Sequence, residues 1–254
     1  MTSLLVDIGN TRVKWALLRG SRLGRMNAVA HEGRPDVLRG LVRSVPLGVT
    51  RVVAVTVAGA KLERALNAAA RARFGVRVEY VQSVRHAAGV RNGYRDTWRL
   101  GADRWVGIVG AHDIAGARHA LAINVGTALT IDAVTAEGRH LGGIITPGPS
   151  TMVASLLDGT HGIRRRAAGK RAGRVVRRGG FARDTASALA TGAALAAASL
   201  IDRAVREARA TLGATPMVLL TGGAAAQLLL HIRSSCRVVP DLVLRGLGVL
   251  ARRP

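Results

Sequence analysis

The sequence predicts an α/β protein built from two related halves. Segments rich in β-branched residues alternate with segments of helical periodicity along the chain. A short pattern also occurs twice: an apolar strand, a polar residue, a glycine–threonine turn and a second strand. The polar residue is Asp7 in the first copy and Asn124 in the second, about half the chain apart. Two such turns in two halves indicate a duplicated fold that holds one nucleotide in a cleft.

Residues 2–19 are expected to form a hairpin around the first of these turns. An apolar run leads into Asp7, and the alternating pattern resumes at Val13. Asp7 offers a carboxylate for Mg²⁺ or its waters, and Gly9 lets a ligand approach the backbone. Thr11 and Lys14 supply a hydroxyl and a positive charge for phosphate oxygens. An ordinary charged hairpin explains one copy equally well, and the second copy favours the phosphate interpretation.

The rest of the first half should alternate helices and strands. We expect a further strand within 20–33, a helix over 35–44, a strand over 49–58, a helix over 61–74 and a strand over 76–81. Residues 92–99 are polar and aromatic and predict a loop. A helix over 106–115 follows, with Asp103 and Arg104 at or near its N-terminus. Asp103 is there either a first-turn or N-cap acid or a functional carboxylate.

The second half repeats the plan. We expect strands over 119–124, 128–135 and 139–145, a helix over 150–157, a helix over 186–209 capped by Asp184 or Thr185, a strand over 217–220, a Thr221-Gly222-Gly223 turn, a helix from 224, a strand over 237–239 and a last helix over 240–250. Residues 164–183 are rich in arginine and glycine without an acidic residue before Asp184, which predicts a basic surface loop. The boundary between halves falls near Gly116, giving domains 1–116 and 117–254.

Composition narrows the function classes. The net charge of +23 attracts anionic ligands, and nucleic acid is one of them. Only three of the 38 basic residues are lysines, a bias typical of a GC-rich genome. The 3% aromatic content argues against single-strand binding by stacking. No GxxxxGK[ST] loop is present, which excludes a P-loop kinase.

Cys236 is the only cysteine, so we expect no internal disulfide and a reducing cytoplasm. We expect no export signal, because the N-terminus enters a strand directly. The apolar run Ala186–Ile201 is shorter than the roughly 20 residues of a membrane span and predicts a buried helix.

The motifs together resemble the type III pantothenate kinases, which include the Bvg accessory factors. The markers are Asp7-Ile8-Gly9-Asn10-Thr11, Tyr94, Leu100-Gly101-Ala102-Asp103-Arg104, Gly126-Thr127-Ala128 with Thr130-Ile131-Asp132, Gly142-Gly143 with Pro147-Gly148, Thr185, Thr221-Gly222-Gly223 and Pro240-Asp241-Leu242. Each motif is weak alone, but their order and spacing make the resemblance strong over nearly the whole chain.

The resemblance implies an actin-like ATPase of the acetate and sugar kinase, heat-shock chaperone and actin superfamily. It implies ATP-dependent phosphorylation of pantothenate, the first step of coenzyme A synthesis, by a homodimer that uses Mg²⁺ and K⁺ or ammonium. The ATP-binding residues would be Asp7, Ile8, Gly9, Asn10, Thr11, Arg12, Val13, Lys14, Gly126 and Thr127. The pantothenate-binding residues would be Tyr94, Gly101, Ala102, Asp103, Arg104 and Thr185. Asp103 would be the general base, and Arg104 could pair with the pantothenate carboxylate.

Two positions depart from the family pattern. Asn124 stands where the family has an aspartate that helps bind the monovalent cation, so cation affinity should fall with the lost charge. Thr97 stands where the family has a proline. These departures and the charge motivate an alternative, a weakly active or inactive accessory protein that binds nucleic acid through 164–183.

Overall fold

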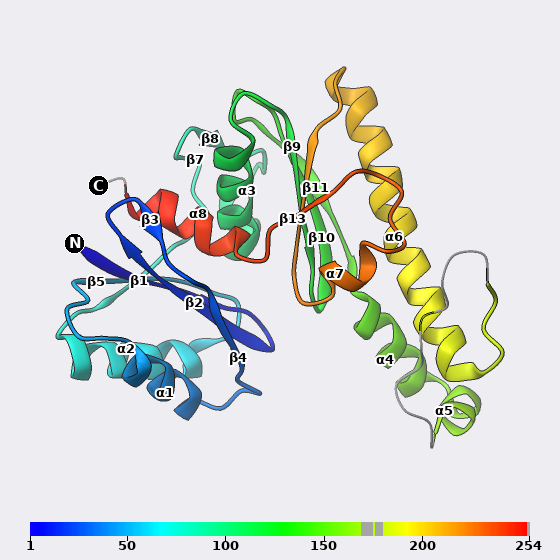
Figure 1. Cartoon of the computed structure of the whole chain (residues 1–254), viewed down its shortest axis with the longest axis horizontal. Helices are drawn as coiled ribbons and strands as arrows, with labels where there is room; N and C mark the ends of the chain where they lie inside the picture. The colour runs from blue at the N-terminus through cyan, green and yellow to red at the C-terminus, as the bar shows by residue number, and fades with distance from the viewer. Residues whose placement is uncertain (169–174, 176–179, 253–254) are drawn as a thin grey trace. The chain divides into compact units, whose positions relative to one another are not determined.

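The structure is a computed structural model that describes residues 1–168, 175 and 180–252. It divides into two compact units (Figure 1). Unit 1 comprises Met1–Ala117, Val134–Gly142 and Asp241–Pro254, and unit 2 comprises Arg118–Ala133 and Gly143–Pro240. The chain thus leaves unit 1 and returns to it twice. The units are not the two contiguous halves expected from the sequence, because the C-terminal helix packs in unit 1.

Unit 1 is built on a six-stranded mixed sheet. Its strands are β1 (Thr2–Ile8), β2 (Arg12–Arg19), β3 (Arg22–Leu23), β4 (Asn27–Ala30), β5 (Arg51–Thr56) and β6 (Val78–Tyr80). The order is β3-β2-β1-β5-β6, and β4 also pairs with β2. β1 is antiparallel to β2 and parallel to β5, so the predicted first hairpin is confirmed.

Helices cover both faces of this sheet. They are α1 (Asp36–Ser44), α2 (Ala60–Phe74), α3 (Ala102–Ala115) and α8 (Leu242–Ala251). In β1 the even-numbered residues Leu4, Val6 and Ile8 pack with α1 and α2. Leu5 packs on the other face with Val106 of α3 and Leu244 of α8. Successive side chains of a strand point to opposite faces, so Asp7 lies on the face of α3 and α8.

α3 and α8 cross at a contact that only glycine permits. A Cβ at Gly110 would lie 2.6 Å from the carbonyl oxygen of Leu242, and one at Gly246 would overlap the carbonyl oxygen of Val106. The two backbones therefore approach more closely than any side chain allows. This contact holds the C-terminal helix against the helix that carries Asp103.

Gly246→Ala should therefore destabilise the protein by about 1–3 kcal/mol, because the methyl group must push the two helices apart. Thermal unfolding measures the effect. Gly107→Ala is the matched control on α3, since a Cβ there meets nothing within 4 Å. Equal midpoints for the two variants would contradict the close-contact explanation.

Unit 2 contains a five-stranded sheet of order β11-β10-β9-β12-β13. Its elements are β9 (Ala120–Val125), β10 (Ala128–Val134), β11 (His140–Pro147), α4 (Pro149–Gly159), α5 (His161–Ala167), α6 (Thr185–Leu212), β12 (Met217–Thr221), α7 (Ala225–Leu228) and β13 (Arg237–Val238). The last residue of β10, Val134, and the first residues of β11, up to Gly142, belong to unit 1. α6 packs along this sheet (Figure 1), and residues such as Ala197 and Ile201 join Ile123 in its core.

α6 is longer than the sequence predicts. Asp184 is its N-cap and accepts a hydrogen bond from the Ser187 backbone N–H at 3.0 Å. Among the described residues it is the one helix long and apolar enough to cross a membrane, but half of its apolar window is buried. That burial agrees with the predicted core helix.

The arginine-rich segment differs from its prediction. Residues 164–166 lie in α5, so the first part of 164–183 is helical rather than a loop. Charge marks this segment as exposed, but charge alone does not select its backbone conformation. Residues 169–174 and 176–179 of the segment lie outside the described residues. The short strands β7 (His86–Ala87) and β8 (Val90–Arg91) and the 3₁₀ helix η1 (Thr97–Arg99) are further elements that the sequence did not predict.

Candidate functional site

The first hairpin turns tightly between Ile8 and Arg12. The backbone N–H of Gly9 donates to the Arg12 carbonyl at 3.0 Å and closes the turn. Asn10, Thr11 and Arg12 are exposed at its tip. We call residues 7–14 the Asp7 hairpin. Its exposed backbone and hydroxyl groups are of the kind that binds phosphate oxygens.

Asp7 and Lys14 are directly opposite each other on β1 and β2, so their side chains share one face of the sheet. Asp7 is only 7% exposed. Burial raises the pKa of Asp7 from 3.8 to about 6, Lys14 lowers it, and the charge of Asp103 raises it further. A buried carboxylate is suited to receive a cation.

Asp103 lies in the first turn of α3, after Gly101 at the N-cap. Its Oδ1 accepts a hydrogen bond from the Arg104 backbone N–H at 2.8 Å. Asp103 is thus a first-turn acid, which is one of the two interpretations given from the sequence. It is also half-buried and close enough to Asp7 to affect its pKa. The structure therefore brings two predicted site carboxylates together within unit 1.

Arg104 is almost fully buried and contacts Tyr94. Its Nη1 donates to the Tyr94 hydroxyl at 3.1 Å, and its guanidinium carbon lies 5.6 Å from the centre of the Tyr94 ring. Tyr94 is fixed in turn, because its backbone N–H donates to Asn92 Oδ1 at 2.9 Å. We call residues 94–104 the Asp103 segment. It presents a carboxylate, a guanidinium and a phenol in one short stretch of unit 1.

His140 contacts Tyr94 of the Asp103 segment, and the sequence did not predict this contact. Its ring stacks on Tyr94 with centroids 5.9 Å apart and planes 15° apart, and it is 1% exposed. Its Nδ1 lies 3.4 Å from the Gly93 backbone nitrogen. His31 is a second such residue, and it contacts the Asp7 hairpin. Neither lies in a motif, so no local signal could have found them.

The second hairpin belongs to unit 2. The backbone N–H of Gly126 donates to the Ala128 carbonyl at 3.0 Å, as Gly9 does to Arg12 in the first hairpin. The Thr127 carbonyl accepts from Gly148 N–H at 2.8 Å and from the Thr151 hydroxyl at 2.6 Å. A Cβ at Gly148 would overlap the Gly126 carbonyl. The Pro147-Gly148 motif therefore braces the Gly126-Thr127 turn.

The Thr221-Gly222-Gly223 motif lies beside the same turn. β12 is parallel to β9, with Thr221 paired to Asn124. Gly222 has φ +102°, and a Cβ there would overlap the Val125 carbonyl. Asn124 itself is half-buried at the end of β9. Three sequence motifs of the second half thus converge on one turn in unit 2.

Thr185 is the first residue of α6 and is half-buried. It lines an apolar hollow of about 450 Å³ together with residues of α4 and α5, among them Met152 and Ile163. Asp184 rather than Thr185 caps the helix, so the Thr185 hydroxyl is not used as the N-cap.

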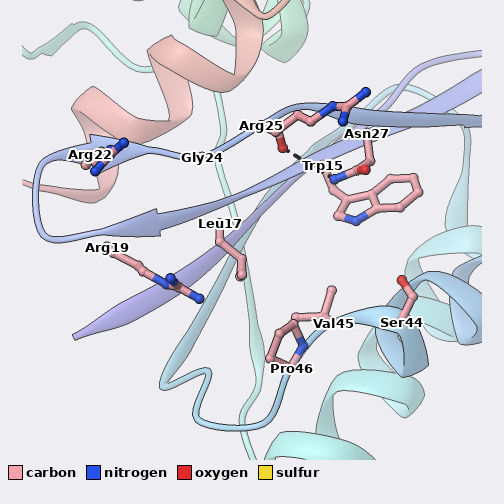
Figure 2. A pocket seen from close by; sticks show the side chains of 10 residues that line it. All are labelled: Trp15, Leu17, Arg19, Arg22, Gly24, Arg25, Asn27, Ser44, Val45 and Pro46. Atoms are coloured by element: carbon pink, nitrogen blue, oxygen red, sulfur yellow. Dashed lines mark hydrogen bonds between the residues drawn. The ribbon is translucent and has the colours of Figure 1, made fainter.

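One hollow in unit 1 lies away from the Asp7 hairpin (Figure 2). It has a volume of about 640 Å³, and Trp15 and Leu17 of β2 point toward Ser44, Val45 and Pro46 across it. Trp15 is next to Lys14, so its side chain is on the opposite face of the sheet. The hollow therefore opens on the α1 face, whereas Asp7 and Lys14 lie on the α3 face.

No group of three or more His, Cys, Asp or Glu side chains that could hold a metal ion occurs among the described residues. A protein-only metal cage is therefore absent from that part of the chain. The buried carboxylate of Asp7 fits a cation shared with phosphate oxygens.

Comparison with known proteins agrees with the family and the fold class expected from the sequence. A family model described as "Type III pantothenate kinase" matches residues 3–207. The type III pantothenate kinase of Aromatoleum aromaticum is 38% identical over 98% of this chain and 97% of its own. That of Nitrosococcus oceani is 34% identical over 98% and 93%.

Among solved structures, a putative 2-dehydro-3-deoxygalactonokinase protein from Sinorhizobium meliloti has a TM-score of 0.60 at 16% identity, with 98% of both chains covered. This neighbour belongs to the actin-like ATPase fold, so the predicted fold class is confirmed.

Proposed function

We propose that the Asp7 hairpin and the Asp103 segment carry the activity of the family to which this chain belongs. The chain is a member of the type III pantothenate kinases, and it transfers phosphate from ATP to pantothenate in coenzyme A biosynthesis. The observation that supports this assignment is the position of Asp7 on the sheet face covered by α3, the helix whose first turn carries Asp103. Phosphoryl transfer needs a phosphate-binding group and a proton acceptor in one place.

The Asp7 hairpin is the proposed ATP site of unit 1. Asn10, Thr11 and Arg12 present backbone N–H groups and a hydroxyl at its exposed tip, and Lys14 supplies a positive charge. Ile8 and Val13 are buried and pair with each other on β1 and β2, and Gly9 closes the turn between these strands. In unit 2, Gly126 and Thr127 are the proposed phosphate-binding residues of the matching turn. Asp7 would hold Mg²⁺ directly or through water, and the ion would neutralise charge on the phosphates.

Asp103 is the proposed general base. A carboxylate at this position accepts the proton of the pantothenate hydroxyl as that oxygen attacks the γ-phosphorus. Gly101 and Ala102 set the start of α3 beneath it. Thr185 of unit 2 is a further proposed pantothenate contact.

Pantothenate-dependent release of ADP, measured with Mg²⁺ in a coupled assay, tests the function. We expect ADP release to require pantothenate. ATP hydrolysis that is equally fast without pantothenate would overturn the assignment. Nothing in the described residues favours the alternative of a nucleic-acid-binding accessory protein.

Arg104 is the proposed partner of the pantothenate carboxylate, so Arg104→Lys should raise the KM for pantothenate about 10- to 100-fold. Lysine keeps the charge but loses the planar fork and the contact with Tyr94. The KM for ATP should stay within about twofold. Arg99→Lys is the matched control, because Arg99 is an exposed partner of Asp96 in the same segment. An unchanged KM for pantothenate in Arg104→Lys would remove this role.

Asn124 is the proposed ligand of a monovalent cation, K⁺ or ammonium. Its amide oxygen is a neutral ligand, so activation by K⁺ should be weak, and Asn124→Asp should lower the K⁺ concentration for half-maximal activity by about tenfold. Kinase rates measured across a K⁺ series at constant ionic strength provide the test. Equal K⁺ dependence in both proteins would argue against a cation at this residue.

We further propose that the protein is a cytoplasmic homodimer. Large apolar side chains are exposed in unit 2, including Ile145, Leu156 and Leu195. Residues of this kind favour a protein interface where they form one contiguous patch. Sedimentation equilibrium of the full chain distinguishes a dimer from a monomer.

A further inference from the structure

His31 holds the Asp7 hairpin from the side. It follows β4 directly and is 1% exposed. Its ring Nε2 lies 2.8 Å from the Gly9 carbonyl oxygen, and its backbone N–H donates to the Thr11 carbonyl at 3.1 Å. One buried residue therefore engages two carbonyl groups of the same turn.

The protonation of the His31 ring follows from its contacts. The backbone N–H of Gly33 donates to Nδ1 at 3.0 Å, so Nδ1 is an acceptor and carries no proton. Nε2 is then the protonated nitrogen of the neutral ring, and it donates to the Gly9 carbonyl. Both ring nitrogens are engaged within the protein, so the ring acts through the hairpin and not on a ligand.

The turn behind His31 is built to hold the ring in this position. The Arg34 backbone N–H donates to the His31 carbonyl at 2.7 Å, and Glu32 and Gly33 have φ values of +48° and +74°. Two left-handed residues inside such a hydrogen bond define a type I′ turn. Glu32 is not glycine, so the surrounding contacts stabilise a backbone conformation that costs about 1 kcal/mol or more.

The two carbonyl contacts fix the direction of two amide groups. A trans peptide is planar, and its C=O and N–H point in opposite directions. Since no cis peptide bond occurs in the described chain, fixing the Gly9 and Thr11 carbonyls toward His31 turns the N–H groups of Asn10 and Arg12 away from it. Those are two of the backbone donors at the exposed tip of the Asp7 hairpin.

We propose that His31 is a positioning residue for ATP: it orients the Asn10 and Arg12 N–H groups of the Asp7 hairpin toward the phosphates. The proposal rests on the assignment of ATP phosphates to this hairpin. Its distinguishing consequence is selective: losing the His31 ring affects ATP and leaves pantothenate binding unchanged.

The test compares His31→Gln with His31→Asn and His31→Leu in steady-state kinetics. Glutamine places an amide N–H near the position of Nε2 and should keep kcat/KM for ATP within about threefold. Asparagine is too short to reach Gly9, and leucine has no donor. Both should lower kcat/KM for ATP about tenfold, mainly through KM, with the KM for pantothenate unchanged.

His112→Leu is the matched control. His112 also hydrogen-bonds a carbonyl in unit 1, that of Ala136 at 3.1 Å, but it lies at the last turn of α3. Its loss should lower the unfolding midpoint without a change in the KM for ATP. If His31→Leu does not fold, the comparison of glutamine with asparagine decides. Equal KM values for ATP in the glutamine and asparagine variants would overturn the proposal.

Thr11→Val separates this proposal from the function on which it rests. If Thr11→Val raises the KM for ATP and the His31 variants do not, the hairpin binds ATP and the role of His31 is rejected. If neither change affects ATP, the ATP site of unit 1 is itself misplaced, and the His31 proposal is rejected with it.

Discussion

Asp103→Asn should lower kcat about 10²- to 10⁴-fold while ATP still binds. Asparagine has nearly the shape of aspartate, and its oxygen can still accept the Arg104 N–H that Asp103 accepts at 2.8 Å. What it cannot do is take a proton from the attacking hydroxyl, and general base catalysis contributes a factor of this size. Steady-state kinetics with both substrates, together with calorimetric titration of ATP, measure the two effects separately.

Asp113→Asn is the control for charge on α3. Asp113 is an exposed acid near the other end of the same helix, so its loss should leave kcat within about twofold. The unfolding midpoint of Asp103→Asn should stay close to that of the wild type, since the first-turn contact survives. If Asp103→Asn retains more than about a tenth of the wild-type kcat, another group must accept the proton.

The local elements of the fold were predictable because their signals are local. The alternation around Val13 and the run before Asp7 define the first hairpin, and the structure confirms it. Arg164–Arg166 show the limit of such signals. Their charge predicts exposure correctly, but a charged run fits a surface helix as well as a loop, and the chain forms α5 there.

The candidate site was predictable only residue by residue. Asp7 and Asp103 were both identified from motifs, but their proximity depends on strand parity and on which face α3 covers. His31 was missed because its ring contacts Gly9, which lies 22 residues earlier in the chain. His140 was missed for the same reason, since its partner Tyr94 belongs to a distant loop. Contacts between distant residues leave no pattern in a single sequence.

Asp7→Asn should abolish measurable kinase activity and yet stabilise the substrate-free protein at neutral pH. Asp7 is buried, so its negative charge lowers the stability of the folded state. Activity should fall because an amide lacks the negative charge that holds Mg²⁺ near the phosphates. Coupled ADP release measures the first effect, and unfolding in the presence of a chelator measures the second.

The pH dependence of stability gives the sign of this effect. The pKa of Asp7 is about 6 in the folded protein, whereas an unperturbed aspartate has a pKa of 3.8, and burial is the main cause of the difference. Between these values the folded state binds more protons than the unfolded state, so the free energy of unfolding falls as pH rises. The difference amounts to at most about 3 kcal/mol above pH 6.

Asp7→Asn should therefore unfold at a higher temperature than the wild type at pH 7.5, and the gap should close as pH falls toward 4. Asp36→Asn is the control, because Asp36 lies at the exposed start of α1, where its charge is solvated. A variant less stable than wild type at pH 7.5 would mean that the Asp7 carboxylate stabilises the hairpin. Its burial would then be a structural feature of unit 1 rather than a preparation for binding a cation.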